Sequence, residues 1–192
     1  FQTLARDKDT VTVTTGRNSY TAPAVILAFG SNIPIDLGIY GEAKMVARSL
    51  GNPEEHIGAP TLVLGGGNAA ADVVSTLSKT KRAANDSTPV YWGHRREHFK
   101  VDKNVARDLG EEILLGGNIK ILQGAVPRIG EIDEEGIERL IIQTQSIALP
   151  SGVEMQQGMS FPMKHVIACI GTQGPSRVFD AIGLQQITCT EG

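Results

Sequence analysis

The chain has 192 residues, of which 41% are hydrophobic, with a net charge of −3 and a pI of about 5.8. This composition favours a folded core, and the acidic balance gives no reason to expect nucleic acid or an anionic membrane as a partner. The two cysteines form no C-x-x-C pair, and no apolar run exceeds strand length, so neither a disulfide framework nor a membrane span is expected. No signal peptide is apparent, and we expect a cytoplasmic protein.

The N-terminal part reads as extended chain. Residues 10–15 (TVTVTT) alternate like a strand, and residues 24–30 (AVILAFG) have the composition of a buried strand ending in glycine. Residues 42–50 (EAKMVARSL) predict a short helix that ends at a Gly-Asn-Pro turn. The change from this β-rich sequence to alternating strands and helices at about residue 58 predicts a domain boundary.

A glycine-rich motif follows the buried strand predicted for residues 61–64. It has the form G-x-G-x-x-A, with Gly65, Gly67 and Ala70 in the small positions. The first glycine permits a tight turn, the second lets the backbone approach a pyrophosphate, and the third small residue lets helix and strand pack closely. The candidate phosphate-binding residues are Gly65, Gly66, Gly67, Asn68, Ala69 and Ala70. The alternative is a glycine turn with no ligand.

The remaining elements alternate as in an α/β domain. Helices are predicted over residues 68–79 and 104–115, strands over 90–92, 119–122 and 164–171, and an antiparallel meander over 126–145 with an acidic tip at 133–136. Strands that alternate with helices favour a parallel sheet with helices on its faces. Trp92, the only tryptophan, is expected in the core of that sheet.

A basic stretch follows the second predicted strand, where dinucleotide-binding domains contact the ribose of the adenosine. His94, Arg95, Arg96 and Lys100 lie there, and paired arginines suit a 2′-phosphate and therefore NADPH. Asp86, about 20 residues beyond the glycines, is rejected as a ribose ligand because it precedes the strand. The alternative for the stretch is a solvated basic surface.

Few other residues suggest chemistry. Gly171 ends a strand beside the expected cleft and is a candidate for backbone contact with the nucleotide. Cys169 lies in an apolar run and reads as a small buried hydrophobe, while the four histidines have no metal-ligand spacing. No acid, base or nucleophile stands out, so the isolated chain is expected to bind nucleotide without turning it over.

These residues together resemble the NAD(P)H-binding domain of the pyridine nucleotide-disulfide oxidoreductase family, in particular thioredoxin reductase-like flavoproteins. GGGNAAAD at residues 65–72 resembles the family's glycine stretch, and HRREHFK at 94–100 resembles its H-R-R-x-x-x-R/K stretch, with Lys100 where arginine is common. Residues 166–171 resemble the closing strand. Ala28 to Gly30 is similar to an Ala-Thr-Gly of the FAD domain, with Phe29 in place of threonine.

The resemblance implies a Rossmann-like, three-layer α/β domain inserted into an FAD domain. Residues 1–40 would be remnant FAD-domain strands, 41–57 a connector, 58–175 the NAD(P)H-binding domain, and 176–192 the return to the FAD domain. The FAD pyrophosphate motif of the family is absent, which implies that the chain is part of a longer flavoprotein that passes a hydride from NADPH to FAD. The sequence names no electron acceptor and leaves the oligomeric state open, with a homodimer as one option.

One departure bears on the reaction. Thioredoxin reductases carry C-x-x-C just before the central strand, whereas residues 45–60 contain no cysteine. A relative such as a ferredoxin–NADP reductase fits better, and the small subunit of glutamate synthase has a similar glycine stretch. Two other hypotheses remain: a non-enzymatic NAD(P)-sensing Rossmann module, and a single-domain dehydrogenase, for which Tyr20, Tyr40 and Tyr91 supply no catalytic Tyr-Lys pair.

Overall fold

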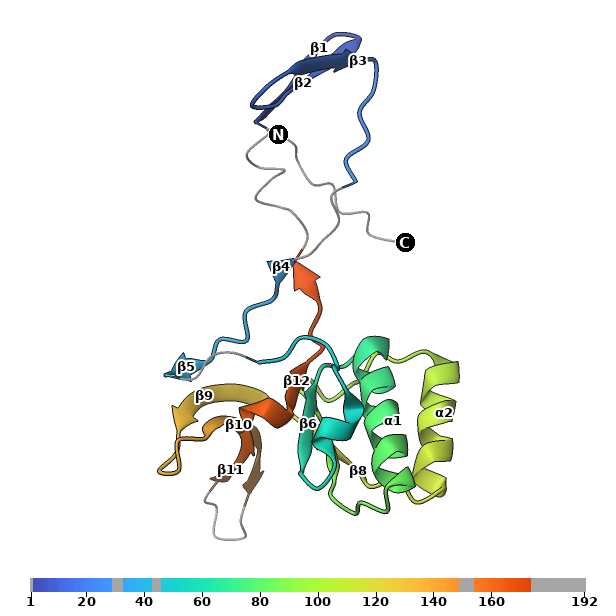
Figure 1. The fold of residues 1–192 in the computed structure, drawn as a ribbon, viewed down its shortest axis with the longest axis vertical. Helices are drawn as coiled ribbons and strands as arrows, with labels where there is room; N and C mark the ends of the chain where they lie inside the picture. Colours follow the sequence, from blue (N-terminus) through green and yellow to red (C-terminus); the bar gives the residue numbers. More distant parts are fainter. Residues whose placement is uncertain (1, 29–32, 43–45, 149–153, 174–192) are drawn as a thin grey trace. The chain divides into compact units, whose positions relative to one another are not determined.

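The computed structural model describes residues 2–28, 33–42, 46–148 and 154–173 (Figure 1). The chain divides into two compact units, one made of Phe1–Ile35 with Thr172–Gly192 and the other of Asp36–Gly171. The first unit is therefore assembled from both ends of the chain, while the second is one continuous stretch.

The first unit holds two small antiparallel sheets. Strands β1 (Thr3–Asp7), β2 (Thr10–Thr14) and β3 (Ser19–Ala22) pair in sequence order. The second sheet pairs β4 (Ile33–Pro34) with β13 (Thr172–Gln173). The alternation of threonine and valine in β2 therefore predicted a strand correctly.

The second unit is built on a four-stranded parallel sheet with the order β12–β6–β7–β8. Its strands are β6 (Thr61–Leu64), β7 (Val90–His94), β8 (Ile119–Gln123) and β12 (Val166–Ala168). Helices α1 (Asn68–Ala83) and α2 (Lys103–Leu114) connect the strands and cover one face of the sheet (Figure 1). This is the α/β arrangement that the alternating elements predicted.

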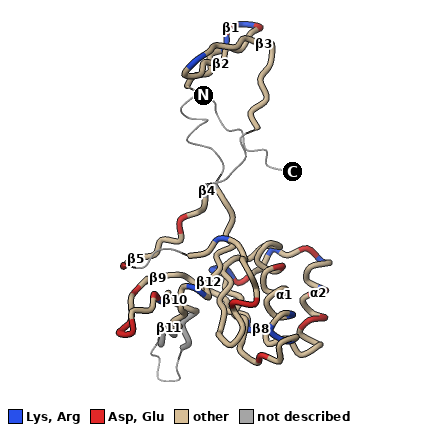
Figure 2. Tube along the Cα trace, in the orientation of Figure 1, with Lys and Arg blue, Asp and Glu red and all other residues tan. Residues whose placement is uncertain are grey.

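An antiparallel meander covers the opposite face. It contains β9 (Val126–Ile132), β10 (Glu138–Ala148) and β11 (Glu154–Pro162), with the short β5 (Tyr40–Gly41) pairing parallel to β9 at its edge. The turn between β9 and β10 carries the acidic run at 133–135, shown in red in Figure 2. The predicted meander over 126–145 is confirmed, and the structure adds β11 to it.

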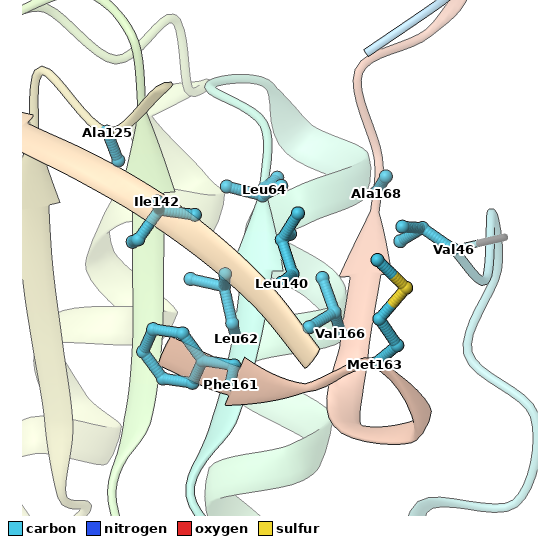
Figure 3. Close-up of a cluster of buried hydrophobic side chains, with 10 residues drawn as sticks. All are labelled: Val46, Leu62, Leu64, Ala125, Leu140, Ile142, Phe161, Met163, Val166 and Ala168. Carbon is cyan, nitrogen blue, oxygen red and sulfur yellow. The ribbon is translucent and has the colours of Figure 1, made fainter. Parts of the chain in front are cut away.

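Two hydrophobic clusters hold the three layers together, and β6 contributes to both because its side chains alternate. Leu62 and Leu64 point into the cluster between the parallel sheet and the meander, whereas Val63 points toward the helices. The first cluster, shown in Figure 3, contains Val46, Leu62, Leu64, Ala125, Leu140, Ile142, Phe161, Met163, Val166 and Ala168. The second contains Val63, Ala70, Ala71, Val74, Leu77, Val90, Trp92, Leu109 and Ile167.

Two predicted elements do not form. Residues 24–28 are not a strand, and Ile26 is 92% exposed; Phe29 and Gly30 lie outside the described residues. An apolar run becomes a strand only where another strand pairs with it, and none of the described strands does so here. The helix predicted over 42–50 is also wrong for its described part, residues 46–50. Val46 is buried in the core and Ala47 pairs with Ile167, so tertiary packing overrides helix propensity.

The other predicted elements form with shifted ends. Helix α1 continues to Ala83, β7 includes His94, and α2 begins one residue early at Lys103. The closing strand is shorter than predicted and contains only Val166–Ala168. Residues 163–165 form the 3₁₀ helix η2 (Met163–His165) instead, and residues 169–171 lie outside the strand.

A buried lysine ties α1 to the start of the parallel sheet. The Lys81 ammonium donates to the carbonyls of His56 and Ala59 at 2.6 and 2.7 Å, to Asp86 Oδ2 at 3.0 Å and to Thr88 Oγ1 at 2.7 Å. Burial would raise the pKa of Asp86, but hydrogen bonds from Thr88, Gly58 and Lys81 hold it well below its usual range. Lys81 thus joins helix α1, the loop before β7, and the 3₁₀ helix η1 (Pro53–His56).

A buried pair of histidines joins the two 3₁₀ helices, η1 and η2. The Nδ1 atoms of His56 and His165 lie 3.2 Å apart, and the residues are 7% and 6% exposed. One ring must donate and the other accept, so the contact requires at least one neutral ring. Burial lowers the pKa of both histidines, and the charge of Lys81 lowers both further.

We therefore expect the stability of the second unit to fall on acidification below about pH 6.5, the ordinary histidine pKa. Histidines with lowered pKa values bind fewer protons when folded than when unfolded, so stability is fully present above that pH and is lost as the pH falls through the folded pKa values. Urea unfolding followed by Trp92 fluorescence between pH 7.5 and 5.5 tests this. A His165→Gln variant should lose less stability over this interval than wild type, whereas exposed His98→Gln should behave as wild type. An identical pH dependence for His165→Gln would contradict the expectation.

Candidate nucleotide-binding site

The glycine turn lies at the carboxyl end of β6, and its first residue can only be glycine. Gly65 has φ +142°, and a Cβ placed on it would lie 2.3 Å from the Cys169 carbonyl oxygen and 3.1 Å from the Ala70 Cβ. The turn therefore needs small residues at both Gly65 and Ala70, so that the end of β12 and the first turn of α1 can approach it. This is the helix–strand packing that the G-x-G-x-x-A spacing predicted.

The next two glycines differ from the first. A Cβ on Gly66 would lie 2.6 Å from the His94 ring, whereas a Cβ on Gly67 would meet nothing closer than the Lys100 carbonyl at 3.9 Å. Gly67 has φ −114° and ψ −177°, an extended backbone open to any residue. The fold itself therefore gives no reason for glycine at position 67.

Helix α1 begins directly after this turn. Gly67 is its N-cap and makes no side-chain capping hydrogen bond, and the Gly67 carbonyl accepts from the amides of Ala70 and Ala71 at 3.1 Å. Ala69 is exposed on the first turn. The first turn carries no acidic residue, so its positive dipole end is not offset within the helix. An anion placed there would receive backbone N–H groups.

The basic stretch lies beside the glycine turn. His94 is the last residue of β7, half-buried against Gly66, and burial together with the charges of Arg96 and Arg95 lowers its pKa. The Arg95, Arg96 and Lys100 side chains are exposed. The lowered pKa favours the neutral imidazole, and the three cationic side chains are exposed on a stretch whose backbone contacts the glycine turn.

Trp92 is buried in the core, as predicted, and also holds the turn, which the sequence did not indicate. Its Nε1 donates to the Gly65 carbonyl at 2.7 Å, while the Gly65 amide donates to the Gly93 carbonyl at 2.9 Å. Phe99 stacks edge-on against Trp92 with ring centroids 4.4 Å apart and lies 5.2 Å from the His94 ring. These aromatic contacts fold the basic stretch back toward the turn.

Backbone contacts complete the link. The Lys100 amide donates to the Gly66 carbonyl at 2.6 Å, and Lys100 forms a parallel bridge with Gly67. Beyond it, Asn68 Nδ2 donates to Asp102 Oδ2 at 2.6 Å, and the Asp102 amide donates to Asn68 Oδ1 at 2.9 Å. Asn68 and Asp102 are 34 positions apart in the sequence, so no local sequence pattern could have indicated these hydrogen bonds.

The remaining candidates are placed as follows. Gly171 has φ +83° and is exposed, two residues beyond the Cys169 carbonyl that approaches Gly65. Burial raises the pKa of the Cys169 thiol, consistent with a packed rather than reactive side chain; Cys189 lies outside the described residues.

Asp86 forms an ion pair with Lys81 in the loop before β7, which supports its rejection as a ribose ligand. Within the described ranges, no three His, Cys, Asp or Glu side chains cluster as metal ligands.

The family model described as pyridine nucleotide-disulphide oxidoreductase matches residues 1–145, which is most of the chain. The chain belongs to this family. The predicted resemblance is therefore confirmed, and with it the assignment of the chain to a family of oxidoreductases.

Curated family members match the sequence over part of their length. A ferredoxin–NADP reductase of Thermus thermophilus is 32% identical over 115 residues, covering 56% of this chain and 32% of the reductase. A ferredoxin–NADP reductase of Neorickettsia sennetsu is 30% identical over 144 residues, covering 68% of this chain and 41% of the reductase. The chain thus spans less than half the length of either relative.

Solved structures of the family share the fold. The bacillithiol disulfide reductase Bdr (YpdA) of Staphylococcus aureus superposes with a TM-score of 0.67 at 16% identity, covering 95% of this chain and 51% of that chain. The thioredoxin reductase of T. acidophilum gives a TM-score of 0.63 at 13% identity, covering 96% and 56%. These matches confirm the three-layer, Rossmann-like fold. None of the helices in the described part of the chain is long and apolar enough to cross a membrane.

Proposed function

We propose that the second unit binds NADPH and orients it toward an FAD-dependent reaction of a longer parent protein. In that parent, residues 1–40 and 176–192 would belong to the FAD domain, and residues 58–175 to the NAD(P)H-binding domain. Bound FAD would supply the chemistry by accepting a hydride from NADPH. The names of the two ferredoxin–NADP reductases favour NADP(H) as the nucleotide.

The main support is the hydrogen bond from the Lys100 amide to the Gly66 carbonyl, which keeps the basic stretch against the glycine turn. The residues from Gly65 to Ala70 would hold the pyrophosphate at the start of α1. Arg95, Arg96 and Lys100 would meet the 2′-phosphate, with neutral His94 beside them and Gly171 contributing backbone. No general acid or base is assigned, because this unit's role is binding and orientation.

Calorimetric titration of the chain with NADPH and NADH tests the proposal. We expect NADPH to bind more tightly, and an Arg95→Ala/Arg96→Ala variant to lose on the order of a hundredfold in NADPH affinity with little change for NADH. The reason is that each charge-assisted hydrogen bond contributes about 1.5–3 kcal/mol.

A Lys79→Ala/Arg107→Ala variant is the matched control. It also removes two exposed positive charges, but from the helices outside the basic stretch, and should keep the NADPH preference. Equal binding of NADPH and NADH by wild type would contradict the 2′-phosphate assignment. If neither nucleotide binds, the proposal is contradicted for this chain. The alternative, a glycine turn that holds no ligand, would then be favoured.

A further inference from the structure

The Asn68–Asp102 pair connects the two parts of the proposed nucleotide site. Asn68 is the first residue of α1, where a pyrophosphate would lie, and Asp102 follows the basic stretch by two residues. Two reciprocal hydrogen bonds of 2.6 and 2.9 Å join them. A bidentate side-chain contact fixes orientation as well as distance, so the pair constrains the path of residues 94–102 relative to the glycine turn.

Asp102 is the N-cap residue of α2, but its side chain makes no capping hydrogen bond to that helix. Aspartate at an N-cap ordinarily accepts a hydrogen bond from the first turn of its own helix. Here the carboxylate makes no such bond and turns to Asn68 instead. Stabilisation of α2 therefore does not explain this contact, whereas the joining of the two segments does.

Exposed cations recognise a phosphate strongly only if their backbone is already in place, because ordering a loop on binding costs affinity. The basic stretch is anchored at one end by β7 and at the other by Lys100 and Asp102. We propose that Asn68 and Asp102 are positioning residues that determine the preference for NADPH over NADH, although neither contacts the 2′-phosphate. This inference rests on the proposed function and adds a specificity-determining pair to it.

An exchange of the two residues tests the role. In Asn68→Asp, two carboxylates face each other and the contact breaks. In the double variant Asn68→Asp/Asp102→Asn, the carboxylate and amide change places, so that the amide of residue 102 and its new side-chain NH₂ can again donate to residue 68. The double variant has the same net charge as wild type. The carboxylate that it places at residue 68 would act on the pyrophosphate, which NADPH and NADH share, so this effect cancels in the ratio of the two affinities.

The readout is the ratio of NADPH to NADH affinity, measured by calorimetry with the whole chain. We expect Asn68→Asp to reduce this ratio by about tenfold, the value of one charge-assisted hydrogen bond, and the exchange to restore it to within about threefold of wild type. Urea unfolding followed by Trp92 fluorescence shows whether each variant is folded.

Two results overturn the inference. One is a ratio in Asn68→Asp equal to that of wild type, including the case in which both affinities fall in parallel. The other is an exchange that does not restore the ratio in a folded protein. In each case the proposed function still stands if wild type prefers NADPH and Arg95→Ala/Arg96→Ala does not. If wild type itself has no preference, the proposed function fails, and the positioning role fails with it.

Discussion

A Gly65→Ala variant is expected to lose about 3 kcal/mol or more of the stability of the second unit. Two costs combine: a positive φ is strained for any residue with a Cβ, and the added methyl would lie 2.3 Å from the Cys169 carbonyl oxygen. The Cys169 carbonyl cannot move away easily, because it belongs to the backbone at the end of β12. Urea unfolding measured by the fluorescence of Trp92, whose indole bonds to the Gly65 carbonyl, reports on this unit directly.

Gly67→Ala is the matched control, and it separates folding from binding. A methyl on Gly67 meets only the Lys100 carbonyl at 3.9 Å, and its φ of −114° suits alanine, so stability should change by less than about 0.5 kcal/mol. If a pyrophosphate lies against this backbone, the same variant should bind NADPH at least about tenfold more weakly. Equal stability loss in both variants would contradict the structural distinction between the two glycines.

The glycine turn could be predicted from the sequence because part of its constraint is local. The spacing of Gly65 and Ala70 reflects a contact between the strand end and the helix that follows it at once, since a Cβ on Gly65 would lie 3.1 Å from the Ala70 Cβ. The place of the basic stretch was predictable for a similar reason: β6 and β7 are parallel neighbours, so the residues after each strand meet at one edge.

The contacts that unite the site could not be predicted, because they join residues distant in sequence. The Trp92–Gly65 hydrogen bond spans 27 positions and the Asn68–Asp102 pair spans 34. Tryptophan in a predicted strand indicated burial, but not what its indole would bond to. The helix expected over residues 42–50 failed on the same grounds, since the pairing of Ala47 with Ile167 depends on a strand more than a hundred residues away.

The largest effect away from the site is expected for Lys81→Met, at about 3–5 kcal/mol of destabilisation. Removing one partner of a buried ion pair leaves the other charge without compensation, and Asp86 is 7% exposed at its side chain. The carbonyls of His56 and Ala59 would also lose a donor. Lys79→Met, which removes an exposed lysine from the same helix, should stay within about 0.5 kcal/mol of wild type in the same urea unfolding experiment.

A double-mutant cycle distinguishes the ion pair from simple loss of packing. If the uncompensated carboxylate causes the loss, Lys81→Met/Asp86→Asn should be more stable than the sum of the two single variants predicts, since the second change removes the isolated charge. The deficit of Lys81→Met should also shrink as the pH falls, because a carboxylate without its ammonium partner is protonated more easily than in wild type. Additive losses together with a deficit that does not change with pH would show that Lys81 acts through its packing and its carbonyl contacts rather than through its charge.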